Sequence, residues 1–166
     1  MNALFPNPAL LSELSLRHRR LQDALLKTGA DAMLFSANVS LYYVSGQVYR
    51  GWFYLPAEGS PVYFMKRPIG LQGETLHYIQ HPREIPERLR ELGISTPGKL
   101  LIEGETSYEE WMQWKEWFPH TVLDNATRVL RKVRAVKLLG NSNKSSNQLD
   151  YIPLDINRFR HCTVLV

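Results

Sequence analysis

The sequence has one cysteine, no long apolar run and no leader-like start. The single Cys162 excludes an internal disulfide framework and a cysteine-rich zinc site. No stretch approaches the roughly 20 apolar residues that a membrane span needs. The first residues carry neither a basic segment nor a long apolar segment, as a secretory signal would. We therefore expect a cytoplasmic protein that makes no membrane contact.

Motifs for phosphate binding and nucleophilic catalysis are also absent. The chain contains no Gly-x-Gly-x-x-Gly, Walker or Gly-x-Ser-x-Gly sequence. His77 and His81 are four residues apart, but Pro82 follows at once and no His-Glu-x-x-His frame surrounds them. A pair of surface histidines is the preferred interpretation, and Cys162 is interpreted as an incidental thiol because no persuasive base lies near it. The sequence thus predicts neither a catalytic nor a metal site.

The residues that are present suit one globular domain. Hydrophobic residues make up 44% of the 166 residues and charged residues 22%, with a net charge of +4. Helical and extended patterns alternate along the chain, which is typical of an α/β fold. Helices are predicted over 12–28, 38–44, 86–92, 107–118 and from 124 or 125 to about 137, and strands over 31–35, 51–55, 61–65, 76–79, 99–102 and 121–123.

Two acids and one basic helix each have a functional and a structural interpretation. Glu103 and Glu105 follow a predicted strand, where acids can be catalytic, but loop or helix-start residues are the favoured interpretation. The cations of the last helix can meet phosphates in principle; they are Arg128, Arg131, Lys132, Arg134 and Lys137. They are spaced around an amphipathic helix with no nucleic-acid-binding motif beside them. We interpret them as a solvated face and expect no nucleic-acid partner.

The most distinctive segment is Tyr49-Arg-Gly-Trp-Phe-Tyr54. An arginine among four aromatic residues, in a loop that enters a strand, suits stacking on a ligand or on a partner subunit. The same residues suit a hairpin whose rings pack on the sheet. Both interpretations stay open, and Tyr49, Arg50 and Trp52 are the candidate site residues.

Six further features follow one another along the chain. They are Arg17-x-x-x-Leu21, Gly29-Ala-Asp-Ala32, Asn38-Val-Ser-Leu-Tyr-Tyr-Val-Ser-Gly46, Arg50 with the hairpin after it, Leu101-Ile-Glu103 and Val133-Arg-Ala-Val-Lys137. Their order and spacing over about residues 14 to 137 resemble the amino-terminal domain of the creatinase, prolidase and Xaa-Pro aminopeptidase family of metallopeptidases. No single motif carries the resemblance; the order and spacing together do.

The resemblance implies a fold, and it implies that catalysis takes place in a separate domain. The implied fold is α/β, a mixed β-sheet flanked by helices in a ribonuclease-H-like arrangement. In the family, a following domain supplies two Asp, one His and two Glu that hold two divalent metals (Mn, Co or Zn), which activate water against the bond before proline. None of those ligands can be carried onto this chain. The chain alone is therefore expected to lack catalysis and to meet a peptide substrate only through that domain.

The resemblance also implies an assembly role. In the family, the amino-terminal domain helps to form dimers and borders the active site, often that of a neighbouring subunit. We accordingly expect a homo-oligomer. Arg50, with Tyr49 and Trp52, is the candidate for the border position.

The end of the chain departs from the family pattern. After the motif ending at Lys137 the family continues with Ser-x-x-Glu and Ile or Leu, whereas here Leu138-Leu-Gly-Asn141 follows. Codons for those four residues, read one base along, can spell Ser-Trp-Glu-Ile. We therefore expect a family-like domain over 1–137 and an atypical, frameshifted or otherwise altered tail over 138–166. Sequencing the encoding DNA tests this, since a shifted frame without catalytic-domain ligands would contradict it.

Three functions follow as alternatives. The favoured one is a non-catalytic amino-terminal domain of a proline-specific metallopeptidase (Xaa-Pro dipeptidase-like or aminopeptidase-like), serving dimerisation and the shaping of substrate access. The second is a free-standing binding or assembly module with no link to a peptidase. The third is a nuclease or nucleotide enzyme of ribonuclease-H type, which needs clustered acidic metal ligands. Asp31 and Glu103 are too small a set for that chemistry.

Overall fold

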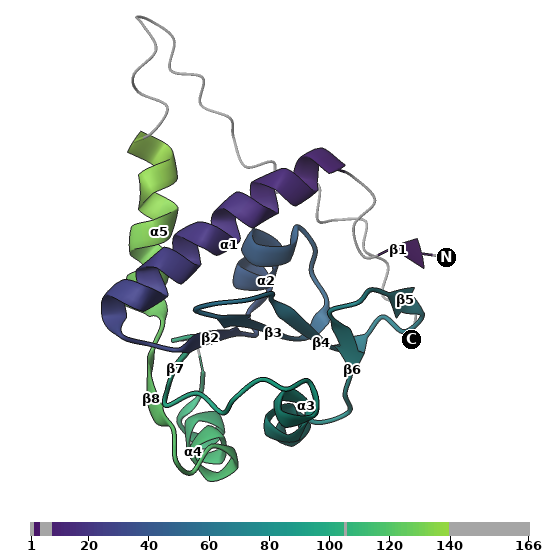
Figure 1. The fold of residues 1–166 in the computed structure, drawn as a ribbon, viewed down its shortest axis with the longest axis vertical. Helices are drawn as coiled ribbons and strands as arrows, with labels where there is room; N and C mark the ends of the chain where they lie inside the picture. The colour runs from purple at the N-terminus through teal and green to yellow at the C-terminus, as the bar shows by residue number, and fades with distance from the viewer. Residues whose placement is uncertain (1, 4–7, 105, 140–166) are drawn as a thin grey trace, which may run out of the picture.

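A mixed β-sheet lies between two layers of helices (Figure 1). The computed structural model describes residues 2–3, 8–104 and 106–139. The helices are α1 (Pro8–Thr28), α2 (Asn38–Ser45), the short 3₁₀ helix η1 (Pro82–Glu84), α3 (Ile85–Glu91), α4 (Tyr108–Trp117) and α5 (Thr127–Leu139). The strands are β1 (Asn2–Ala3), β2 (Ala32–Phe35), β3 (Arg50–Pro56), β4 (Val62–Arg67), β5 (Leu71–Gln72), β6 (Leu76–Tyr78), β7 (Lys99–Ile102) and β8 (Val122–Asn125). None of the described helices has the length and apolar character needed to cross a membrane.

The main sheet has six strands in the order β6-β4-β3-β2-β7-β8. Strand β3 pairs antiparallel with β2 and β4, and the other neighbours pair in parallel. This order, with β3 reversed relative to its neighbours, is the ribonuclease-H-like arrangement that the family resemblance implied. Strands β1 and β5 form a separate two-stranded pair that the sequence pattern did not predict.

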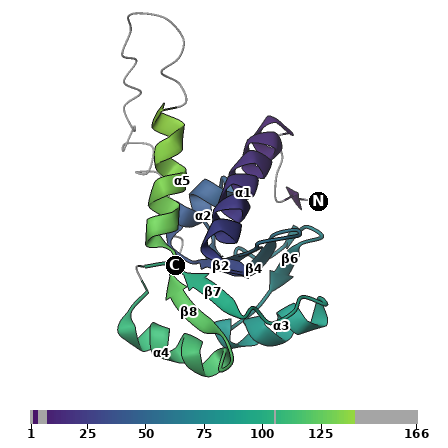
Figure 2. The same ribbon diagram turned by 60° about the vertical axis from the view of Figure 1, so that its left-hand side comes forward.

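Each face of the sheet has its own apolar layer because side chains alternate along a strand. On β3, Phe53 and Leu55 are buried with residues of α1, α2 and α5, whereas Tyr54 is buried with residues of α3 and α4. The helices divide in the same way in Figure 2. All four residues of β2 are buried, which explains why that strand forms an unbroken apolar run in the sequence.

The predicted hairpin is formed by β3 and β4. Its register shifts between Arg50 and Gly51. A Cβ atom on Gly51 would lie 2.1 Å from the backbone oxygen of Phe64, so the close approach of the two strands requires glycine at this position. The irregularity is confined to the end of β3 at which Arg50 lies.

Two predicted helix ends are confirmed. Gly46 ends α2 with a φ of 70°, and its N–H donates to the carbonyl of Tyr42. Ser107 and Glu110 form the capping box of α4. The Ser107 hydroxyl accepts from the Glu110 N–H at 3.2 Å, and the Glu110 carboxylate accepts from the Ser107 N–H at 3.0 Å.

Two other helix starts differ from the prediction. Helix α1 begins at Pro8 rather than at residue 12, because proline is well tolerated in the first turn. The chain is already helical from Pro82, in η1, so helical structure begins before residue 86, where the predicted helix starts. Ile85 and Leu89 are buried in the core, whereas Leu92, just after α3, is 39% exposed.

The last helix also starts later than predicted. Asp124 and Asn125 form the end of β8, and α5 begins at Thr127. Asn125 nevertheless caps the helix, since its side-chain oxygen accepts from the Thr127 N–H at 2.7 Å.

Helix α5 runs to Leu139 and so passes the predicted boundary at residue 137. Residues 140–166 lie outside the described residues, and with them Cys162 and most of the segment to which the frameshift hypothesis applies. The division into a domain over 1–137 and a tail over 138–166 stays a prediction.

Candidate functional site

The structure separates the three candidate residues Tyr49, Arg50 and Trp52. Arg50 is exposed at the start of β3. Tyr49 is only 6% exposed and belongs to the apolar layer on the α1, α2 and α5 side of the sheet. Trp52 is half-buried against the opposite layer. Of the three, Arg50 is therefore the residue that an external group can reach freely.

The side chain of Tyr49 is buried beneath this region. Its ring centroid lies 6.4 Å from that of Tyr63. Its hydroxyl is buried and has no hydrogen-bond partner among the described residues. Burial raises the pKa of the Tyr49 phenol well above its usual range, so the group stays neutral. Any contact with an external ligand or subunit therefore falls to Arg50.

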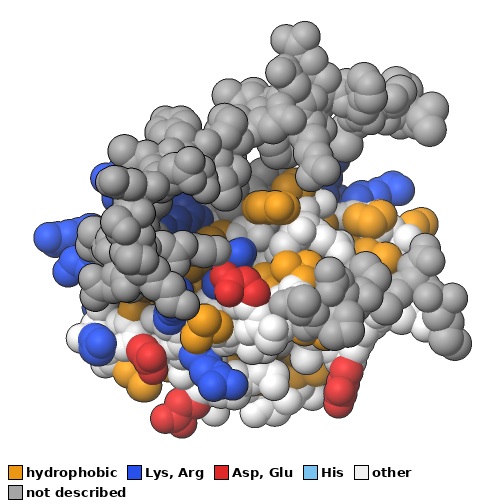
Figure 3. Space-filling model, turned by 90° about the horizontal axis from the view of Figure 1, so that it is seen from above, with side chains coloured by type: hydrophobic (Ala, Val, Ile, Leu, Met, Phe, Trp, Pro, Cys, Tyr) orange, Lys and Arg blue, Asp and Glu red, His pale blue; other side chains and the backbone are white. Residues whose placement is uncertain are grey.

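Arg50 lies in a shallow depression of about 620 Å³, which we call the Arg50 surface. It is lined by Asn38, Val48, Tyr49, Arg50, Arg67, Pro68 and Ile69. Arg67 is paired with Arg50 across the hairpin. Val48 is 49% exposed and Ile69 70%. Cationic and apolar side chains also lie side by side on the face seen in Figure 3.

Arg67 and Ile69 were not among the candidates from the sequence. Arg67 was predictable from the hairpin pattern. Extending the predicted strand over 61–65 by two residues places Arg67 opposite Arg50. Ile69 follows the Arg67-Pro68 bond beyond β4, and no periodicity predicts its exposure. Exposed apolar side chains next to guanidinium groups are typical of protein interaction surfaces.

Glu103 has a structural role. The side chain is 7% exposed, and one carboxylate oxygen accepts from the N–H groups of Ser36 at 3.1 Å and Ala37 at 2.8 Å. The Ser40 hydroxyl donates to the other oxygen. The carboxylate thus satisfies N–H groups at the start of α2. The favoured structural interpretation of Glu103 is confirmed, and Glu105 lies outside the described residues.

Arg134 does not belong to a solvated face, which corrects the prediction for the basic helix. Its Nη2 donates to the Ser40 hydroxyl at 2.8 Å, and its guanidinium lies 5.3 Å from the ring centroid of Tyr43. Arg17 lies over the same ring at 5.0 Å. The Tyr43 ring is therefore contacted by two guanidinium groups, one from α1 and one from α5. Arg128, Arg131 and Lys132 are exposed, as predicted.

The histidine pair occupies structural positions. His81 is exposed and caps η1, since its Nδ1 accepts from the Arg83 N–H at 3.3 Å. His77 is half-buried on β6, and its ring centroid lies 6.4 Å from that of Phe64. Within the described ranges, no three His, Cys, Asp or Glu side chains gather closely enough to hold a metal ion.

Asp31 and Glu103 lie at opposite ends of neighbouring parallel strands. In that pairing Ala32 is opposite Leu100, and Leu34 is opposite Ile102. Asp31 precedes this run and Glu103 follows it, so about 13 Å of strand length separates them. Two carboxylates placed this way cannot share the metals of a ribonuclease-H-type nuclease.

Several solved structures have the same fold. The N-terminal domain of an X-Pro dipeptidase from Streptococcus pyogenes has a TM-score of 0.56 at 14% identity, over 70% of this chain and 98% of that chain. The N-terminal domain of cytoplasmic peptidase PepQ from Mycobacterium tuberculosis H37Rv gives 0.57 at 20% identity, over 72% and 98%. The prolidase from Pyrococcus horikoshii OT3 gives 0.56 at 17% identity, over 72% and 35%. At these identities the likeness establishes the fold alone.

The sequence comparison identifies the family. No curated protein matches this chain. The profile of the Creatinase/Prolidase N-terminal domain matches residues 17–136, which is well over half of the chain and covers the elements from α1 to α5. The chain therefore belongs to the creatinase/prolidase N-terminal domain family.

Proposed function

We propose that this chain serves as the non-catalytic N-terminal domain of an Xaa-Pro peptidase-like hydrolase. The extent of the structural match carries the proposal. The chain aligns with 98% of the two bacterial N-terminal domains but with 35% of the full Pyrococcus prolidase. A cytoplasmic location belongs to the same proposal, because the similar Mycobacterium tuberculosis protein is described as a cytoplasmic peptidase.

Metal chemistry belongs to a different domain in this proposal. The family resemblance implies two divalent metals (Mn, Co or Zn) that activate water next to the peptide. The residues described here contain no suitable group of three donors, so they do not fit such a pair. We therefore propose that a catalytic domain holds the metals and the peptide substrate.

The Arg50 surface is the proposed contact of this domain within a homo-oligomer. Arg50 and Arg67 can pair with carboxylates of a neighbouring subunit, while Val48 and Ile69 bury apolar area there. Seated between subunits, these side chains would border the entry to a neighbouring active site. The dimerisation and the shaping of substrate access expected from the sequence are both assigned to this surface.

Catalysis is tested with the purified full chain. We expect no hydrolysis of an Xaa-Pro dipeptide in the presence of Mn²⁺, Co²⁺ or Zn²⁺, and no stoichiometric metal in the same sample. Metal-dependent turnover that follows the protein through two chromatographic steps would overturn the proposal, because it requires a catalytic site within this chain.

A free-standing assembly module is the second candidate, and the exposed apolar residues of the Arg50 surface favour it equally. It predicts a tight complex of this chain with itself that needs no catalytic domain. In the N-terminal-domain proposal, by contrast, we expect this chain to self-associate only weakly, as small contact areas do. Sedimentation velocity between 1 and 300 μM separates the two, since a nanomolar dimer supports the module.

A further inference from the structure

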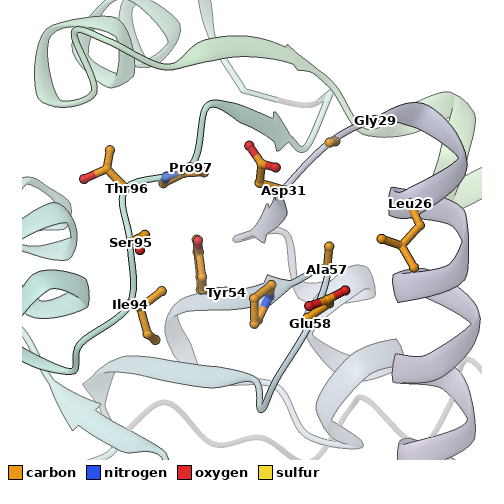
Figure 4. A pocket seen from close by; sticks show the side chains of 12 residues that line it. Leu26, Gly29, Asp31, Tyr54, Ala57, Glu58, Ile94, Ser95, Thr96 and Pro97 are labelled. Atoms are coloured by element: carbon orange, nitrogen blue, oxygen red, sulfur yellow. The ribbon is translucent and has the colours of Figure 1, made fainter.

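A second depression lies on the opposite end of β2 from Glu103. It has a volume of about 640 Å³ and is formed where the end of α1, the β3–β4 turn and the segment before β7 meet (Figure 4). Its lining is Leu26, Gly29, Ala30, Asp31, Tyr54, Pro56, Ala57, Glu58, Ile94, Ser95, Thr96 and Pro97. None of these residues belongs to the Arg50 surface, so this pocket is separate from the site proposed above.

The charged groups of this pocket are acidic. Asp31 and Glu58 line it, and no Lys, Arg or His does, although the chain as a whole has a net charge of +4. One oxygen of Asp31 accepts from the backbone N–H of Lys99 at 2.8 Å. The Lys99 ammonium instead contacts Asp124 at 3.2 Å, so it does not neutralise Asp31. The pocket thus presents two carboxylates without a cation of its own.

The Tyr54 hydroxyl points to a ligand independently of these acids. Tyr54 is 2% exposed, and its hydroxyl lies in the pocket beside Asp31 and Pro97 (Figure 4). No hydrogen bond within the described residues uses that hydroxyl. Burial first, and then the Asp31 carboxylate, raises the pKa of the phenol, so it remains a neutral donor and acceptor. The ring is buried, while the hydroxyl opens into the pocket and is available there to a ligand as donor and acceptor.

The remaining walls are apolar. Leu26, Ala57, Ile94 and Pro97 surround the polar groups, and Leu26 is 56% exposed although it lines the pocket. A divalent metal needs more oxygen ligands than two carboxylates from separate elements provide. Hydrocarbon walls between two acids suit instead an organic cation with an aliphatic body.

We propose that this pocket binds a short aliphatic diammonium compound. One ammonium group donates to the Asp31 carboxylate and the Tyr54 hydroxyl, the methylene chain lies against Leu26 and Ile94, and the second ammonium group pairs with Glu58. In Figure 4, Asp31 and Glu58 lie on different sides of the pocket, as this arrangement requires.

Titration of the ¹⁵N-labelled full chain with 1,4-diaminobutane at constant ionic strength tests the proposal. We expect saturable shifts of the backbone amides of Asp31, Ala57, Glu58 and Ser95. Butylamine should bind about threefold more weakly, because an exposed ion pair contributes little. The neutral 1,4-butanediol should produce no saturable shift. Equal shifts from the diol, or shifts centred elsewhere, would overturn the proposal.

Three variants sharpen the test. Tyr54→Phe keeps the buried ring and should weaken binding about tenfold through the lost hydrogen bond to a charged group. Glu58 lies in an exposed turn, and Glu58→Gln should remove the preference for the diamine over butylamine. Glu116→Gln makes the same charge change on α4, outside the pocket, and should bind as the parent does. If Tyr54→Phe does not fold, an unchanged preference in Glu58→Gln is sufficient to refute the proposal.

Discussion

Among single residues, Glu103 shows how a buried charge can serve structure. Its carboxylate is surrounded by donors: two backbone N–H groups at the start of α2 and the Ser40 hydroxyl. Ser40 in turn accepts from Arg134. A buried carboxylate is tolerated because each oxygen has partners and a guanidinium lies one hydroxyl away.

Replacing Glu103 with Ala should lower the free energy of unfolding by about 2–4 kcal/mol, because the buried N–H groups of Ser36 and Ala37 lose their acceptor. Urea unfolding followed by circular dichroism measures the change. Glu109→Ala on α4 is the control: Glu109 is exposed and should change stability by less than about 0.5 kcal/mol. A Glu103 variant as stable as the control would contradict the structural role.

His18 should make stability depend on pH. Its Nε2 donates to the carbonyl of Val44 at 2.6 Å. Burial is the main cause that lowers the pKa of His18 below 6.5 in the folded state. The unfolded chain therefore binds more protons between the two pKa values, and stability is lost as the pH falls through that window.

Urea midpoints at pH 7.5 and 5.5 test this expectation. The parent should be less stable at pH 5.5, and His18→Gln should lose part of that dependence. His77 contributes in the same direction, since burial also lowers its pKa, so some dependence should persist. His120→Gln, on an exposed residue, should behave as the parent does. An identical pH dependence in His18→Gln would refute the assignment.

Residue-level roles were predictable only where the partner is close in sequence. The Ser107–Glu110 capping box is a local pattern, and the structure confirms it. The donors around Glu103 come from residues 36–40, more than 60 positions earlier, so the sequence showed an acid at a strand end without its partners. For Tyr49 the sequence left both stacking on a ligand and packing on the sheet open, and the structure places its ring in the core.

Helix α5 is attached to the domain by a long-range polar contact as well as by its apolar face. Val129, Leu130 and Val133 of α5 and Ala126 just before it are buried, at the i, i+3, i+4 and i+7 spacing of an amphipathic helix. Arg134 adds a second attachment through Ser40 and Tyr43 of α2, and Arg17 of α1 also lies over that ring. Three helices are thereby joined at one tyrosine.

Arg134→Met should destabilise the domain by about 1–3 kcal/mol, since a charged hydrogen bond and a cation–π contact are both lost. Amide hydrogen exchange should accelerate mainly in α5 and α2. Arg131→Met removes an exposed arginine from the same helix and serves as the control. Equal exchange rates in the two variants would show that Arg134 contributes no more than a solvated arginine.

At the scale of the whole molecule, the Arg50 surface combines two cations with exposed apolar groups at one end of the β3–β4 hairpin. Because Ile69 is 70% exposed, changing it should leave the monomer intact. We expect Ile69→Ser to change stability by less than about 0.5 kcal/mol. The same change should raise the Kd of self-association about tenfold, through lost apolar burial.

Sedimentation equilibrium of the full chain measures this effect. Val122→Ser is the matched control, because Val122 is 62% exposed on β8 and does not line the Arg50 surface. If both variants weaken association equally, the contact does not depend on the Arg50 surface. If neither does, the homo-oligomer uses another face.

The sequence by itself determined the order of the main helices and strands, though not β1 and β5, and it indicated the family. Periodicity, capping residues and turns act over a few positions, so they specify α2, the β3–β4 hairpin, β7 and the buried stripe of α5 without tertiary information. Tertiary structure decided which charges are free. Arg134 donates to Ser40, and Glu103 accepts from an N–H group just before α2. Asp31, Glu58 and Tyr54 line one pocket. Those outcomes depend on strand order, which brings together residues that are distant in the chain.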